Sequence, residues 1–119
     1  MAWSFTSGTA VYLQIADRII KSILSGEYSP GQQLPTVRQL ALEAAVNPNT
    51  VQRSFTELEN EGIIISKGTS GRFVTQDTEI IEQCRQKMAR RIVLDFLKNA
   101  KQLSLTKEQL IEMIKEVTT

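Results

Sequence analysis

The sequence contains no histidine and only one cysteine, Cys84, among its 119 residues. An internal disulfide is therefore impossible, and so is a zinc site made of cysteines. Histidine is the commonest general base and metal ligand near neutral pH, so its absence argues against an enzyme and against a metalloprotein. We accordingly expect no catalytic residue, no cofactor and no metal, and a protein whose activity consists of binding.

Long apolar runs are absent as well. Runs such as 63–65 and 92–94 hold three residues, whereas a membrane-spanning helix needs about 20. The N-terminal segment MAWSFTSGTA lacks the basic region and the apolar core of a secretory signal. Hydrophobic residues make up 41% of the chain and charged residues 23%, which is the composition of a folded globular domain. We expect a cytoplasmic protein without membrane contact.

Glycine and proline occur only within residues 1–75, and residues 76–119 contain neither. The second part is therefore compatible with helix throughout. Its pattern predicts a long helix over about 78–101 and a second helix from Thr106 to about residue 117, opened by a capping box of Thr106 and Gln109. We predict a globular domain in residues 1–75 and a two-helix tail in residues 76–119.

The first part begins with a helix over about 9–25. Its apolar stripe starts at Tyr12 and recurs at spacings of three and four, and Gly26 stands where a left-handed C-terminal cap would end it. Residues 32–34 are predicted to be extended, because Pro35 disfavours helix in the residue before it.

Two short helices and a hairpin follow. Thr36 and Gln39 form a capping box at the start of one helix. Asn47 caps the next helix, with Pro48 at its first position, and Gly62 ends it. Residues 63–67 and 72–75, separated by Gly and Ser, predict a two-stranded hairpin.

This order is that of a winged helix-turn-helix domain: a helix, two helices joined by a tight turn, and a hairpin. The third helix of such a domain enters the major groove of DNA with its N-terminal residues toward the bases. Asn49, Thr50, Gln52 and Arg53 begin that helix here, and amide and guanidinium groups read adenine and guanine. The hairpin places Lys67 and Arg72 beside a glycine turn, where they suit phosphate or minor-groove contacts.

The run GQQLPTVRQLALEAAVNPNTVQRSFTELENEGII, followed by KGTSGRFV, resembles the DNA-binding domain of GntR-family bacterial transcription regulators. The resemblance covers residues 12–74. A tail of two helices is similar to the short YtrA-type branch of that family. Membership of that branch implies dimerisation through these helices and the lack of a large effector-binding domain.

Position by position, the resemblance implies DNA contacts by Arg38, Asn49 and Thr50, a backbone contact by the capping Asn47, and a wing glycine at Gly71. Pro48 departs from the Ser or Arg of many relatives, so a contact from that side chain is lost. The complete set of expected DNA-binding residues is Arg38, Asn47, Asn49, Thr50, Gln52, Arg53, Lys67, Gly71 and Arg72.

Charge does not by itself favour DNA, since residues 1–75 carry six basic and six acidic side chains. The acidic Glu57, Glu59 and Glu61 are expected at the far end of the third helix, away from the groove-facing basic residues. Other roles remain open for the arginines. Arg53 could pair with Glu57 on the helix surface, Arg72 could protect a strand edge, and Arg38 could pair with Glu43.

The tail carries more apolar surface than two helices can cover for each other. Burial against a second copy would give a two-fold dimer, and packing on the chain's own winged helix is the alternative. The expected dimer-interface residues are Ile81, Cys84, Met88, Ile92, Phe96, Leu110 and Ile114.

The sequence thus predicts a mainly α protein with a small β hairpin, a winged helix-turn-helix domain followed by a two-helix dimerisation segment. The expected function is that of a sequence-specific transcription regulator, a repressor that binds a palindromic double-stranded operator as a homodimer. A small-molecule effector is neither indicated nor excluded by the sequence. The alternative function is a winged helix that contacts proteins and not DNA.

Overall fold

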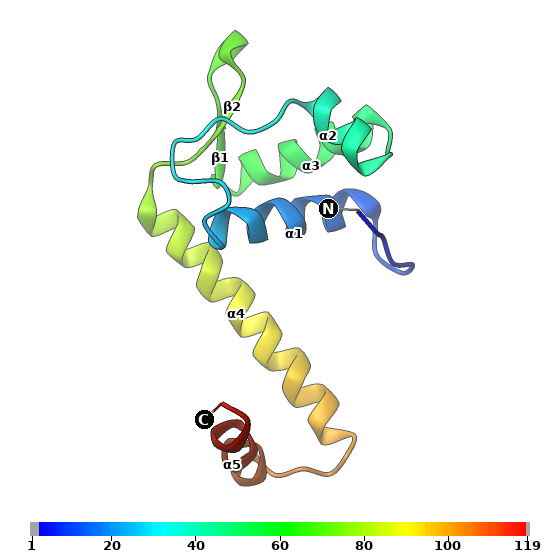
Figure 1. Cartoon of the computed structure of the whole chain (residues 1–119), viewed down its shortest axis with the longest axis vertical. Helices are drawn as coiled ribbons and strands as arrows, with labels where there is room; N and C mark the ends of the chain where they lie inside the picture. Colours follow the sequence, from blue (N-terminus) through cyan, green and yellow to red (C-terminus); the bar gives the residue numbers. More distant parts are fainter. Residues whose placement is uncertain (1–2, 119) are drawn as a thin grey trace. The chain divides into compact units, whose positions relative to one another are not determined.

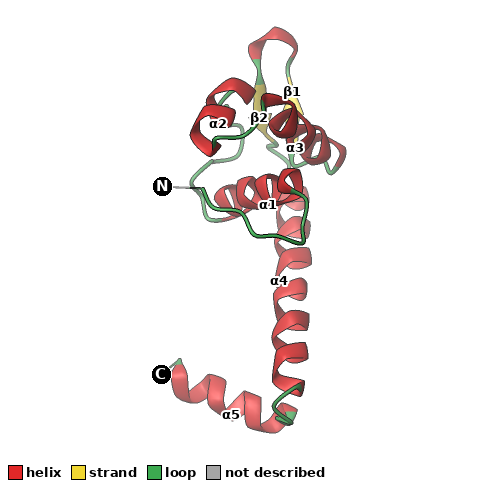
Figure 2. Cartoon of the chain, turned by 90° about the vertical axis from the view of Figure 1, so that its right-hand side faces the viewer, coloured by secondary structure: helices red, strands yellow, loops and turns green. Residues whose placement is uncertain are grey.

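The computed structural model describes residues 3–118, and the chain divides into two compact units, with the boundary in the sequence between Cys84 and Arg85. Five helices and one antiparallel hairpin confirm the predicted fold class (Figures 1 and 2). The elements are α1 (Val11–Leu24), α2 (Val37–Ala44), α3 (Pro48–Asn60), β1 (Ile64–Ser66), the 3-10 turn η1 (Gly68–Ser70), β2 (Arg72–Val74), α4 (Thr78–Lys101) and α5 (Lys107–Val117).

The starts of α2 and α3 are set by their caps, as the sequence predicts. The Thr36 hydroxyl accepts a hydrogen bond from the Gln39 N–H (3.1 Å), and the Gln39 side chain accepts one from the Thr36 N–H (2.8 Å). At α3 the Asn47 side chain accepts from the Asn49 N–H (2.8 Å), and Pro48 occupies the first position. These caps satisfy N–H groups that a helix start leaves unpaired.

The core of the N-terminal unit lies around α3, which packs against α1, α2 and β1. The inner face of α3 is fully buried, with Val51, Phe55 and Leu58 each at most 1% exposed. Burying a side chain of this size stabilises a fold by about 1.5–3 kcal/mol. The opposite face of α3 carries polar side chains, and Gln52, Arg53 and Thr56 on it are exposed.

A third segment pairs with the hairpin, namely residues 32–34, which the sequence predicted only to be extended. Gln33 forms an antiparallel bridge with Phe73, and backbone hydrogen bonds join the segment before α2 to β2. The Leu34 N–H donates to the Arg72 carbonyl (2.8 Å), and the Val74 N–H donates to the Gln32 carbonyl (2.9 Å). The wing is thus attached to the segment that leads into the helix-turn-helix.

Gly71 occupies a backbone conformation that requires glycine, with φ of 110° and ψ of −159°. A Cβ atom at this position would lie 2.8 Å from Nε2 of Gln33, an amide that donates to the Ser70 carbonyl (2.7 Å). Gly71 therefore has a structural role in the wing, whatever its contact with DNA.

We expect Gly71→Ala to lower the free energy of unfolding by about 1–3 kcal/mol, because the new side chain is strained and displaces the Gln33 amide. Gly68→Ala is the matched control. Gly68 also has positive φ (59°), but a Cβ atom there would meet open space, so its cost should stay near 1 kcal/mol. Urea unfolding compares the two, and equal losses would contradict the role assigned to Gln33.

The C-terminal unit contains most of α4 and all of α5, whose predicted bounds are confirmed. Thr106 and Gln109 form the predicted capping box, with hydrogen bonds of 3.1 and 2.8 Å.

Among the helices of the described chain, none is both long and apolar enough to cross a bilayer.

Candidate nucleic-acid interface

The N-terminal half of α3 presents the side chains predicted to contact DNA. Asn49, Gln52 and Arg53 are exposed, and Thr50 is half-buried. Their positions follow from the burial of Val51 and the residues one and two turns beyond it, which turns the intervening positions outward. This half of α3 is therefore accessible to a partner along its polar face.

The side chain of Arg53 lies over an aromatic ring. Its guanidinium lies 3.9 Å from the centroid of the Tyr12 ring, at the start of α1. In the part of the chain that the structure describes, no ion pair joins Arg53 to Glu57, so the surface pairing considered from sequence is not formed. Together with Val11, Asn49 and Thr50, these two side chains line a shallow depression.

Sequence reasoning missed Tyr12 as a functional candidate, because it counted the residue as the first member of the apolar stripe of α1. The residue is only half-buried, and the Arg53 guanidinium lies over one face of its ring. A tyrosine at the end of an apolar stripe keeps a polar tip at the surface, and this was the available signal.

The wing places Lys67 and Arg72 differently. Lys67 is exposed near the turn, with its ammonium 4.7 Å from the centroid of the Phe73 ring. Arg72 is half-buried at the turn end of β2, opposite Ser66, where it forms an ion pair with Glu59 and its guanidinium lies 5.0 Å from the centroid of the Phe55 ring. Arg72 therefore joins β2 to α3.

The ion pair changes the charge pattern expected from sequence, in which Glu59 lay apart from the basic residues. That expectation was wrong for this pair, because β2 returns beside the C-terminal half of α3 and brings Arg72 to Glu59. A carboxylate that accepts from Arg72 offsets its charge. The exposed basic side chains of the predicted set are then Arg38, Arg53 and Lys67.

The remaining predicted residues lie on the elements that surround α3. Arg38 is exposed in the first turn of α2, and Asn47 is exposed at the cap of α3, while Gly71 is half-buried at the end of the wing turn. Within residues 3–118, no group of three or more acidic or cysteine side chains is placed to hold a metal ion.

A family model described as "Bacterial regulatory proteins, gntR family" matches residues 11–74. This chain belongs to the GntR family. The match spans α1 to β2, so it contains every element of the winged helix. The resemblance noted from the sequence is thereby confirmed, and the chain is a DNA-binding transcription regulator of this family and not an enzyme.

Individual relatives extend the similarity into the tail. The uncharacterized HTH-type transcriptional regulator YhcF of Bacillus subtilis is 40% identical over 114 residues, which cover 96% of this chain and 94% of YhcF. The HTH-type transcriptional repressor YtrA of the same organism is 33% identical over 114 residues, covering 94% of this chain and 87% of YtrA.

A solved structure also matches over nearly the whole chain. It is a GntR family transcriptional regulator from Listeria monocytogenes, with 34% sequence identity and a TM-score of 0.87. The match covers 94% of this chain and 98% of that chain. The matched region is thus long enough to include the two C-terminal helices as well as the winged helix.

Proposed function

We propose that this GntR regulator represses transcription in the bacterial cytoplasm by occupying a palindromic operator as a homodimer. Residues 1–75 would bind double-stranded DNA, with α3 in the major groove and the wing in the adjacent minor groove, and residues 76–119 would form the dimer. The observation that carries the proposal is the exposed polar N-terminal half of α3, in a domain whose wing bears the exposed Lys67. Repression is supported by similarity to YtrA, which is named a repressor.

The dimer is supported by apolar surface that the C-terminal unit leaves uncovered. Along α4, Ile92 is 64% exposed and Phe96 is 43% exposed, and on α5 Ile114 is 47% exposed. Three of the other predicted interface residues, Ile81, Met88 and Leu110, are buried within the chain, and Cys84 is half-buried. The proposed contact surface therefore centres on exposed apolar residues, among them Ile92, Val93, Phe96 and Leu97 of α4 and Ile111, Met113, Ile114 and Val117 of α5.

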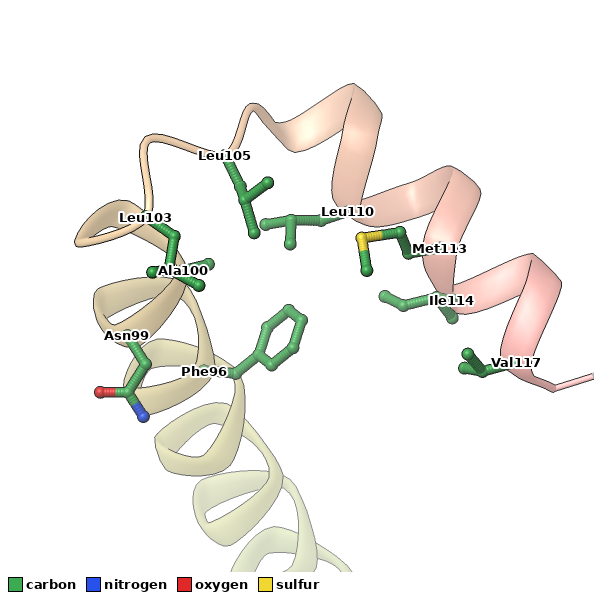
Figure 3. A pocket seen from close by; sticks show the side chains of 9 residues that line it. All are labelled: Phe96, Asn99, Ala100, Leu103, Leu105, Leu110, Met113, Ile114 and Val117. Carbon is green, nitrogen blue, oxygen red and sulfur yellow. The ribbon is translucent and has the colours of Figure 1, made fainter.

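The end of α4 and the length of α5 enclose an apolar concavity of about 340 Å³. Figure 3 shows the Phe96 ring pointing from α4 toward Leu110 and Ile114 of α5. Asn99 is the only residue of its lining with a polar side chain. An apolar surface of this kind marks an interaction site in a protein of this size, and a second copy offers the matching surface through two-fold symmetry.

Selection of bound sequences from random DNA, followed by a salt titration of the best site, tests the proposal. We expect an inverted repeat, as two-fold symmetry requires, and an affinity that falls by about 10³–10⁵-fold between 50 and 200 mM salt if six to ten phosphates are contacted. Undetectable binding at low salt would instead favour the protein-contacting winged helix.

Two matched variants test whether α3 reads bases. Asn49→Ala should cost about 1–3 kcal/mol of discrimination at one base of each half-site, because an amide can pair with adenine in the major groove. Asn60→Ala removes an exposed amide from the opposite end of the same helix, and we expect no change in preference. If Asn49→Ala leaves preferences intact and only lowers stability, Asn49 supports the helix start alone.

A further inference from the structure

We propose that Tyr12 and Arg53 form a binding subsite for one phosphate of the DNA backbone, in which Arg53 anchors the phosphate and does not read a base. This inference rests on the proposed docking of α3 into duplex DNA. It assigns a role to the depression between the starts of α1 and α3, and it adds Tyr12 to the binding surface.

The two helices are joined at this point by a buried hydroxyl group. Ser54, fully buried in α3, donates from its Oγ atom to the Tyr12 carbonyl (2.7 Å) or to the Thr50 carbonyl (3.1 Å). The backbone of Tyr12 is thereby tied to the residue that follows Arg53 in the chain. The hydrogen bond therefore fixes the start of α1 against the turn of α3 that carries Arg53.

The stack determines where the guanidinium can reach. With its guanidinium carbon 3.9 Å from the centroid of the Tyr12 ring, the Arg53 side chain extends toward α1, and its N–H groups remain available to a further partner. A winged helix that enters the major groove with α3 has neighbouring elements beside the sugar-phosphate backbone. Arg53 is therefore directed to the wall of the groove, whereas the exposed Asn49 and Gln52 are left to approach the bases.

The chemistry of the depression suits a phosphodiester. Its lining residues are Val11, Tyr12, Asn49, Thr50 and Arg53, and none is a carboxylate. Apart from Asn49, whose amide is left for the bases, they supply two hydroxyl groups and one guanidinium, which are side-chain types that contact DNA phosphates. An arginine with two parallel N–H groups can hold two phosphate oxygens at once.

The test measures binding of the full chain to its selected operator and to a shuffled duplex of equal length, by fluorescence anisotropy at several salt concentrations. Arg53→Ala should weaken binding to both duplexes by the same factor, about 10- to 100-fold for a charged hydrogen bond. The slope of log K against log salt should fall by about 1. Tyr12→Leu should give a smaller uniform loss, and Tyr12→Phe, which retains the ring, should keep most of the affinity.

Methylphosphonate substitution locates the contact, since it removes the charge of one phosphate at a time. We expect one position per half-site at which the modification lowers the affinity of the wild-type protein as much as Arg53→Ala lowers it on unmodified DNA. At that position the modification should not lower the affinity of the Arg53→Ala variant any further. Arg18→Ala is the matched control. Arg18 stacks on Trp3 at 4.0 Å in a different part of α1, so its removal should leave the salt slope and this coupling unchanged.

Three results would overturn the proposal. An Arg53→Ala loss confined to certain bases at one position would make Arg53 a base reader. If Tyr12→Leu bound both duplexes as tightly as the wild-type protein does, the ring would not be part of the subsite. If no methylphosphonate position were coupled to Arg53, a phosphate contact by Arg53 would be excluded. A wild-type protein that binds no duplex at low salt would instead reject the proposed function itself, and circular dichroism of each variant excludes loss of fold as the cause.

Discussion

Ile92→Glu is expected to convert the dimer into a monomer and to lower operator affinity by about 10²–10⁴-fold. Ile92 is 64% exposed in α4, so a glutamate costs the single chain little. In a dimer the same carboxylate would be buried without a partner, which strongly opposes association. Loss of the second half-site removes the gain in affinity that comes from binding two linked sites at once.

Sedimentation velocity measures the first effect, and fluorescence anisotropy with the full operator measures the second. Lys98→Gln is the control, because it lowers the charge by the same amount on the opposite side of α4, and it should remain dimeric. Met88→Glu would be a poor test, since Met88 is buried within the chain and its loss would damage the fold. An Ile92→Glu protein that still sediments as a dimer would reject the proposed interface.

Phe55→Ala is expected to lower the free energy of unfolding of the winged helix by about 3–5 kcal/mol. The Phe55 side chain is 1% exposed at the centre of the α3 core, and truncation there leaves a cavity in addition to the lost burial. Small domains are stable by about 5–15 kcal/mol in total, so this one substitution removes a large fraction of the native stability. DNA binding should fall in parallel, because the same ring supports Arg72 beside the wing.

Urea unfolding measures this effect, and Leu42→Ala provides the comparison. Leu42 is a large aliphatic residue of α2 that is 78% exposed, and its truncation should change stability by no more than about 0.5 kcal/mol. Similar losses for the two variants would contradict the position of the core described above.

Local features of the fold could be predicted because each depends on residues close together in the sequence. The capping boxes at Thr36 and Thr106 and the proline after Asn47 set helix starts to within a residue or two. The buried face of α3 followed from spacing alone, because apolar residues at intervals of three and four share one side of a helix.

The interface was harder to predict because its contacts join distant parts of the chain. The stack of Arg53 on Tyr12 spans 41 positions, and the bond from Gln33 to the wing spans 37. Periodicity identifies that a residue is apolar or outward-facing, but not which element lies opposite it. The same limit applies to the tail, where Ile92 and Met88 share a predicted stripe and yet differ eightfold in exposure.

The attachment of β2 to the segment before α2 has a consequence for how the protein meets DNA. Backbone hydrogen bonds with Gly31, Gln32 and Leu34 hold β2, and the Arg72–Glu59 pair holds it to α3. A hairpin fixed in this way has already lost its conformational entropy when the protein folds. Little conformational entropy of β2 is therefore left to be lost when the protein binds DNA, so ordering of this strand takes little from the binding free energy.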